Sequence, residues 1–494
     1  MKGLLLRMFN LHDGKACSFN LSPPMNGITV EHLPAEVLSN IFTFCIPDPL
    51  KDDTGGRTTL EILEDVCDTW KMITSSTPEL WTIISVKFHA GTKKRDVEQA
   101  FSSTKLFLQR SGVLSLRISI IDRDRSPNLD CASLLRLIAE HSKRWRYVQF
   151  EMPMKSHRLI NQSHIRKQLS SLEELSLTVS VSTPVYRILS LPHPYTVFKV
   201  APKLRAVRIG RCFPLDGSML PWEQLVEWTG DLDAEIFFHL LRVSTHLRSC
   251  SLPLVTHRPG FQYSGWNRVE NDSVSQLTVE LNSLSKEVLP YVSLPGLTDL
   301  TIKDGTWGTN EYPTFSSRLV GLLNGAHSLR YLRLRQWSSP VSINLVELAS
   351  SAPQVVSLEL EAPSGLTSQC LTSDLLVALT PVMSGTEVIF PKLEHLTCSG
   401  FIFFSDEALY KFIASRWGGL DEQTNTSRNL CLKSVRLEHS ERAMDDIWSS
   451  WARRNPTVHM PPESMHGQGS MKELKEKGFD ISILHSGRVV LWGS

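Results

Sequence analysis

The feature that most constrains the fold is a six-residue pattern, apolar-x-x-apolar-x-apolar, which returns along most of the chain. Each copy follows a stretch whose apolar residues recur at helical spacing, such as EIFFHLLRVSTHL or DEALYKFIASRWG. The clearest copies begin at Leu172, Leu204, Leu297, Leu329, Val355, Leu393 and Leu432, and weaker ones begin at Val113, Trp145, Leu247 and Val274. This order predicts an alternation of helices and strands.

The spacing inside the pattern indicates where its side chains point. The last two apolar positions are two residues apart, so both project from one face of a strand, and the first turns inward from the preceding corner. One strand with one returning helix cannot cover its own apolar face, so neighbouring units must stack. We therefore expect an irregular α/β solenoid over residues 97–440, with a parallel β-sheet on the concave face and helices on the convex face. Residues 441–494 lose the pattern, and a C-terminal cap and tail are expected there.

The residues before this array follow a different rule. Residues 1–30 lack periodicity and contain Pro-Pro and Asn-Gly pairs, so a flexible leader is expected. From residue 31 the character changes: Pro34 suits the first turn of a helix, and apolar residues then recur at helical spacing from Val37 to Cys45. A second helix is expected over about residues 60–75. Together they predict a small all-α module at residues 31–86. Its apolar residues either bind the surface of a partner protein or form only an internal core.

Two stretches of this module, LPAEVLSNIFTFC and LEDVCDTWKMITSSTPELW, carry a specific combination of motifs. An opening Leu-Pro precedes an apolar helix, and a Val-Cys-x-x-Trp is followed by Ser-Thr-Pro-x-Leu-Trp. This combination resembles the F-box domain, and more closely the F-box proteins with a leucine-rich-repeat-like C-terminal region that are abundant in mushroom-forming (basidiomycete) fungi. The resemblance continues in RSGVLSLRISI, HSKRWRYVQFEMP and LPWEQLVEWTG, so it covers most of the chain.

The resemblance implies a substrate-receptor subunit of an SCF-type E3 ubiquitin ligase. The F-box would dock a Skp-family adaptor that bridges to a cullin scaffold, and the repeats would hold a target protein for ubiquitin transfer and degradation. Carried over by motif, the adaptor-binding residues are Leu33, Pro34, Val37, Leu38, Ile41, Phe42, Val66, Cys67, Trp70, Leu80 and Trp81. Some would touch the adaptor and others would hold the helices together. This role is non-catalytic and needs no cofactor or metal.

Charge and composition argue against several other classes. Lys and Arg total 52 against 51 for Asp and Glu, a formal net charge of +1, which gives no global field to gather nucleic acid or anionic lipid. No stretch approaches the roughly 20 apolar residues that span a bilayer, and the start, MKGLLLRMF, is too short for a signal-peptide core. The nine cysteines include no C-x-x-C pair, as expected of free thiols in a reducing compartment. A cytoplasmic or nuclear protein that binds neither nucleic acid nor membrane is expected.

The sequence carries no P-loop, no dinucleotide-binding glycine pattern, no HExxH and no GxSxG. His395, on an expected strand, is interpreted as a surface residue rather than a ligand. Three classes of function therefore compete: the ligase receptor, a repeat scaffold that does not bind the adaptor, and an enzyme whose site is assembled only by the fold.

Candidate target-binding residues come from the polar positions of neighbouring expected strands. Tyr331, Arg333 and Arg335 share one strand, and the next carries Glu359 and Glu361. Since neighbouring strands lie ~4.8 Å apart, the arginines can pair laterally with the glutamates at a surface where each pair contributes little. Alternatively, Tyr331 and the two arginines anchor an acidic or phosphorylated segment of a target.

Overall fold

The structure is a computed structural model. It describes residues 33–46, 59–89, 91–123, 131–162, 165, 168–180, 195–210, 213, 215, 217–253, 255–256, 267–281, 287–304, 315–335, 345–362, 369–381, 388–404, 406–417, 432–439, 474–485 and 488–489. The predicted leader and most of the predicted cap and tail lie outside these residues. The chain divides into two compact units, Met1–Pro221 and Trp222–Ser494, and each is described by itself.

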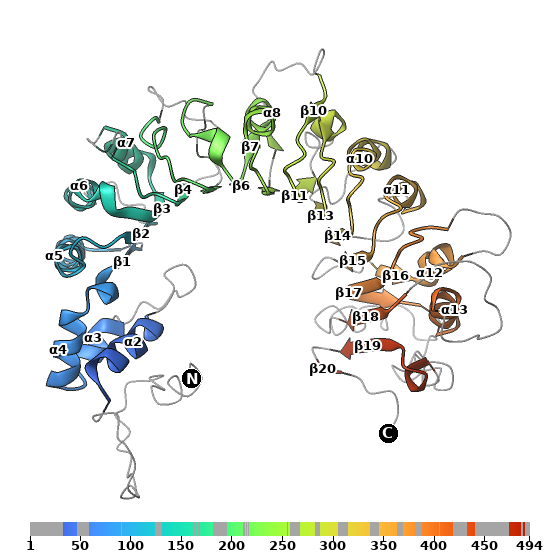
Figure 1. Ribbon diagram of the computed structural model, residues 1–494, viewed down its shortest axis with the longest axis horizontal. Helices are drawn as coiled ribbons and strands as arrows, with labels where there is room; N and C mark the ends of the chain where they lie inside the picture. The colour runs from blue at the N-terminus through green and yellow to red at the C-terminus, as the bar shows by residue number, and fades with distance from the viewer. Residues whose placement is uncertain are drawn as a thin grey trace, which may run out of the picture. The chain divides into compact units, whose positions relative to one another are not determined.

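The first unit opens with short helices and continues with alternating strands and helices. Its helices are α2 (Ala35–Cys45), α3 (Thr59–Glu64), α4 (Asp68–Ser76), η2 (Pro78–Trp81), α5 (Lys94–Arg110), α6 (Ala132–Glu140), η3 (Ser142–Arg144) and α7 (Met154–Gln162). Its strands are β1 (Ile83–Phe88), β2 (Leu116–Asp122), β3 (Trp145–Met152), β4 (Glu174–Val179) and β5 (Ala206–Ile209). The strands pair in that order, all in parallel, and α5, α6 and α7 lie along one face of the sheet (Figure 1).

The second unit repeats the same alternation. Its helices are η4 (Trp222–Gln224), α8 (Ala234–Val243), η5 (Leu289–Tyr291), α10 (Phe315–Leu323), α11 (Leu345–Ser351), α12 (Ser373–Leu379) and α13 (Asp406–Arg416). Its main strands are β6 (Glu227–Gly230), β8 (Ser249–Leu252), β11 (Gln276–Leu281), β13 (Asp299–Asp304), β14 (Tyr331–Arg335), β15 (Ser357–Glu361), β17 (His395–Phe403), β18 (Ser434–His439), β19 (Asp480–His485) and β20 (Arg488–Val489). They pair in that order, in parallel up to β19, while β20 is antiparallel.

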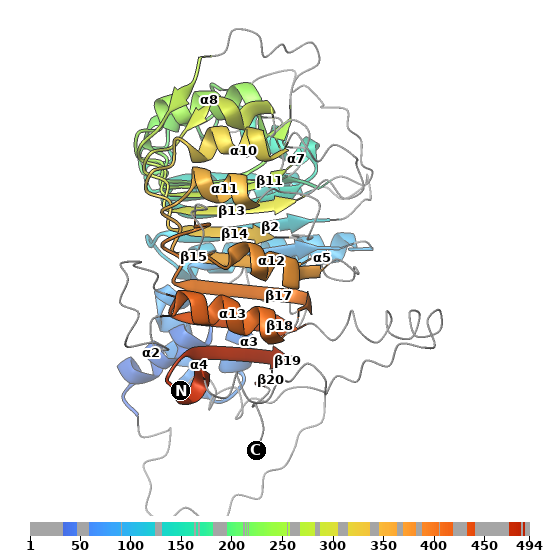
Figure 2. The ribbon, with the colours of Figure 1, turned by 90° about the vertical axis from the view of Figure 1, so that its right-hand side faces the viewer.

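Shorter strands flank this sheet. They are β7 (Leu232–Asp233), β9 (Val255–Thr256), β10 (Val269–Glu270), β12 (Val292–Ser293) and β16 (Gln369–Thr372). Strands β7 and β9 pair with each other, as do β10 and β12, and β16 pairs with β17. Figure 2 shows β17, β18 and β19 as neighbouring rungs with α13 beside them.

The predicted α/β class with a large parallel sheet is confirmed. All three apolar positions of each clear copy of the pattern are buried; in β13 and the turn before it, Leu297, Leu300 and Ile302 are at most 2% exposed. The weak copy at Val113 differs, because Val113 lies in the turn after α5, where Gly112 has φ +54°, and is 91% exposed. Only the two later positions of that copy, in β2, are buried.

Two predicted boundaries shift. Strand β1 begins at Ile83, inside the range predicted for the helical module, and pairs in register with β2. At the other end, β19 pairs in parallel with β18, so the sheet extends past residue 440. IISVKF carries the six-residue pattern at Ile83, Val86 and Phe88, but this copy lies inside the range predicted for the helical module, whereas DISILH does not carry the pattern.

The side chain of Asn271, in the corner after β10, makes hydrogen bonds to four backbone groups. Its Nδ2 donates to the carbonyls of Leu241 and Ser244 at 2.8 and 3.0 Å. Its Oδ1 accepts from the backbone of Ser273 at 3.0 Å and of Val274 at 3.2 Å. A buried amide with this many partners ties the end of α8 to the strand that follows, because losing it would leave several buried groups unpaired.

We expect Asn271→Ala to lower the free energy of unfolding by about 2–3 kcal/mol, since both donors and acceptors lose their partner. The measurement is the urea midpoint followed by circular dichroism. Asn40→Ala, on the exposed side of α2, is the matched control and should leave the midpoint in place. A midpoint for Asn271→Ala equal to that of the control would contradict this role.

His157 of α7 is buried among aromatic rings. Its ring centroid lies 6.0 Å from that of Tyr195 and 5.1 Å from that of Phe213, both edge-on. Its Nε2 lies 3.0 Å from the carbonyl oxygen of Thr178, to which a neutral ring protonated at Nε2 donates. Burial lowers the pKa of His157 to about 4, although the bond to Thr178 acts in the opposite direction.

Acid should therefore weaken the fold at this histidine. Its folded pKa of about 4 lies below the ordinary 6.5, so its contribution is complete above pH 6.5 and is lost as the pH falls towards 4. The full loss is about 3 kcal/mol. Urea midpoints of His157→Phe should depend less on pH in this interval than those of the wild type or of the exposed control His89→Phe. Three equal dependences would contradict the assignment.

Candidate functional site

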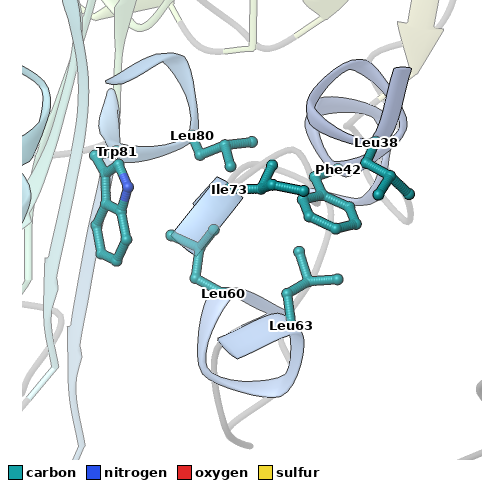
Figure 3. Close-up of a cluster of buried hydrophobic side chains, with 7 residues drawn as sticks. All are labelled: Leu38, Phe42, Leu60, Leu63, Ile73, Leu80 and Trp81. Carbon is teal, nitrogen blue, oxygen red and sulfur yellow. The ribbon is translucent and has the colours of Figure 1, made fainter. Parts of the chain in front are cut away.

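The helices that precede the sheet of the first unit share a small core of their own. Figure 3 shows the side chains of the core converging from α2, α3, α4 and η2. They are Leu38, Phe42, Leu60, Leu63, Ile73, Leu80 and Trp81, none more than 7% exposed. Partly buried Trp70 closes the cluster, its ring 4.7 Å from that of Phe42. These helices therefore have an internal core and do not depend on a partner to form one.

Helix α2 has two adjacent apolar faces. Residues at i, i+4 and i+7 share a face because successive residues turn by about 100°. Leu38 and Phe42 face the core, whereas Val37 is 41% and Phe44 is 79% exposed. Ile41, half-buried, lies between the two sets. The apolar stripe predicted as one surface is thus divided between the interior and the solvent.

The predicted second helix is broken in two. Cys67 adopts an extended backbone, φ −163° and ψ 167°, between α3 and α4. The break turns Val66, 49% exposed, and Cys67 outward, while Leu63 and Ile73 on either side point into the core. Met72 of α4 is 67% exposed. Helical periodicity over residues 60–75 does not reveal this break, because the apolar residues keep a helical spacing on both sides of it.

The predicted adaptor-binding residues accordingly fall into three groups. Leu38, Phe42, Leu80 and Trp81 are buried; Leu33, Ile41 and Trp70 are half-buried; Pro34, Val37, Val66 and Cys67 are exposed. The buried four hold the helices together, so only the other seven can meet another protein without rearrangement. Phe44 and Met72 were not among the predicted residues, although the spacing of Val37, Ile41 and Phe44 at i, i+4 and i+7 could have found the first.

Trp81 joins these helices to α5, the helix that follows the first strand of the sheet. Its Nε1 donates to the carbonyl of Thr74 at 2.8 Å, and its ring lies 4.8 Å from that of Phe107 on α5, edge-on. The Arg110 guanidinium lies over the same ring at 4.3 Å and donates to Glu64 of α3 at 2.7 Å. One arginine thus contacts η2 and α3 at once, and both residues of the ion pair are largely shielded from water.

Arg110→Ala should loosen the helices without unfolding the strands. The variant loses the cation–π contact and the ion pair, together about 1–2 kcal/mol. Amide hydrogen exchange should therefore accelerate in α3 and α4 relative to β2 and β3. Arg123→Ala removes another paired arginine, whose partner is Glu151, and should leave the helices unchanged. Unaltered exchange in α3 and α4 would show that Arg110 does not hold this junction.

The predicted target-binding residues lie on the face of the second unit's sheet that points away from the helices. We call the polar positions on this side of β11, β13, β14 and β15 the open face; they alternate with the buried apolar positions. Tyr331 is 49% exposed there. The predicted lateral pairs are confirmed: Arg333 Nε lies 2.6 Å from Glu359 and Arg335 Nε lies 3.1 Å from Glu361. Both arginines of the predicted anchor therefore already have a carboxylate.

One arrangement on β17 and β18 has the order of a nucleophile, base and acid. The Nδ1 of His395 lies 2.8 Å from the hydroxyl of Ser434, and its Nε2 lies 3.8 Å from the carboxylate of Glu394. The second distance is too long for the hydrogen bond that orients a catalytic histidine. Glu394 instead accepts from Lys433 at 2.7 Å. We interpret the group as a surface network.

Within the part of the chain that the structure describes, no three His, Cys, Asp or Glu residues gather so as to hold a metal ion. Nor do the described helices include one that combines the length and the apolar character needed to cross a bilayer. No protein-family model matches this chain, and no curated protein matches its sequence.

Proposed function

We propose that the chain is the substrate-receptor subunit of an SCF-type E3 ubiquitin ligase. In this role the helices of residues 33–81 act as an F-box module that docks a Skp-family adaptor and, through it, a cullin scaffold. The strand–helix units act as a leucine-rich-repeat-like solenoid that holds the target protein. The role belongs to the cytoplasm or nucleus and is non-catalytic.

The observation that carries the proposal is exposed apolar surface on helices that already possess a core. Val37, Phe44, Val66 and Met72 are 41% to 79% exposed on or beside α2 and α4. Large apolar side chains on a small, otherwise complete helical module are the type of surface that another protein covers. Trp81 and Arg110 are consistent with the same role, because they hold these helices against α5, the first helix of the proposed solenoid.

A second function, a protein-interaction scaffold without a ligase role, is favoured by a different observation. Leu38 and Phe42, central to the resemblance, are at most 2% exposed and serve the internal core. If they serve nothing else, the motif is retained for folding alone. The strand–helix units would then bind a partner with no ubiquitin transfer.

Co-expression of the full chain with a Skp-family adaptor separates the two functions. The wild type should retain the adaptor through affinity purification, and Val37→Asp with Phe44→Asp should lose at least about tenfold of it, because burying a charge in an apolar interface is costly. Val377→Asp is the matched control, since Val377 is 61% exposed on α12 of the other unit. If the wild type fails to retain the adaptor, or if the double variant retains it fully, the ligase role is wrong.

A further inference from the structure

Four charged side chains form a line across the open face. The strand register places Glu280 of β11 beside Lys303 of β13, Lys303 beside Arg335 of β14, and Arg335 beside Glu361 of β15. We call this line the charge row. Its signs run negative, positive, positive, negative. All four are at least partly exposed, from 24% for Glu280 to 48% for Arg335.

The two cations of the charge row turn away from each other. The Nζ of Lys303 donates to Glu280 at 3.1 Å, and the Nε of Arg335 lies 3.1 Å from Glu361. Each cation therefore leans towards the outer strand on its own side. Like charges directly opposite each other on paired strands are unfavourable. An anion placed above β13 and β14 would meet both cations while each keeps its glutamate, since a guanidinium and an ammonium have more donors than one carboxylate satisfies.

The two outer glutamates of the charge row determine which charges a ligand needs on either side of its negative centre. Each is engaged by one cation, and a carboxylate has about four lone-pair sites. A second cation can therefore approach Glu280 and Glu361 from solvent. The ligand that matches the charge row is one with a negative centre and a positive group on each side.

Strand spacing fixes the distances within such a ligand. With strands ~4.8 Å apart, each glutamate lies roughly 7.2 Å from the midpoint between Lys303 and Arg335. In an extended peptide, side chains on one side recur every ~6.8 Å. A peptide crossing the strands therefore places residue i over the cations and residues i−2 and i+2 over the two glutamates.

From this match we infer that the open face binds an extended peptide with the pattern basic-x-acidic-x-basic, laid across β11 to β15. The inference rests on the proposed function only in taking the target to be a protein, and it names the class of segment recognised.

The test is fluorescence anisotropy of labelled nine-residue peptides titrated with the full chain at low ionic strength. One peptide has the core Lys-x-Glu-x-Lys, and its isomer of identical composition has Glu-x-Lys-x-Lys, with serine and alanine at the other positions. The first should bind about tenfold more tightly, and the difference should shrink with added salt, because exposed charges are screened. Equal affinities would overturn the inference.

The decisive variant is Arg335→Glu combined with Glu361→Arg. It preserves net charge and an opposite-charge pair between β14 and β15, yet it changes the row to alternating signs, so the preference should disappear. Glu407→Lys with Lys411→Glu reverses an exposed pair on α13 and should keep the preference. A retained preference in the first variant, or an equal loss in the second, would refute the inference. Adaptor capture involves Val37 and Phe44 instead, so its success or failure is read independently.

Discussion

In the described sheet, the apolar side chains of each strand are shielded from water by neighbouring strands and helices. Leu300 and Ile302 of β13 are buried only because a helix packs on one side of the sheet and the matching pairs of β11 and β14 lie alongside in register. The same register holds over β13, β14 and β15 without a shift. The polar side chains between the buried ones are therefore held at fixed intervals, which turns single surface charges into ordered rows.

The alternation of helices and strands could be predicted because it is written in spacing alone. Positions such as Leu329, Leu332 and Leu334 are buried wherever the clear pattern occurs. The side chains of α2 could not be assigned in the same way. Its apolar residues cover nearly half of the helix surface, and periodicity does not say which part of so wide a band meets the core. Packing against α4 decides which part of the band faces the core. Phe42 packs against Trp70 of α4 and is buried, whereas Phe44, on the neighbouring face, is exposed.

In the candidate target site, too, one part of the arrangement could be predicted from the sequence and another part depends on the tertiary structure. Pairing of Arg333 with Glu359 followed from strand order and was predicted. The part played by Lys303 was not, because a lysine on β13 gains meaning only when the register sets it beside Arg335 and its own partner Glu280 draws it the other way. Neutral rows of this kind contribute little to stability per pair. What they offer a partner is the order of the charges, which net charge does not describe.

Asn271 is followed by Asp272 and Ser273, so the corner that it stabilises also spells an Asn-x-Ser acceptor for N-linked glycosylation. In the folded chain the same Nδ2 that a sugar would occupy donates to two carbonyls, and the hydroxyl of Ser273 donates back to Oδ1 at 2.7 Å. A glycan there would displace the hydrogen bonds that close the corner. Folding and sugar attachment thus exclude each other at this asparagine, and the acceptor motif is one that the native chain keeps out of reach of the transferase.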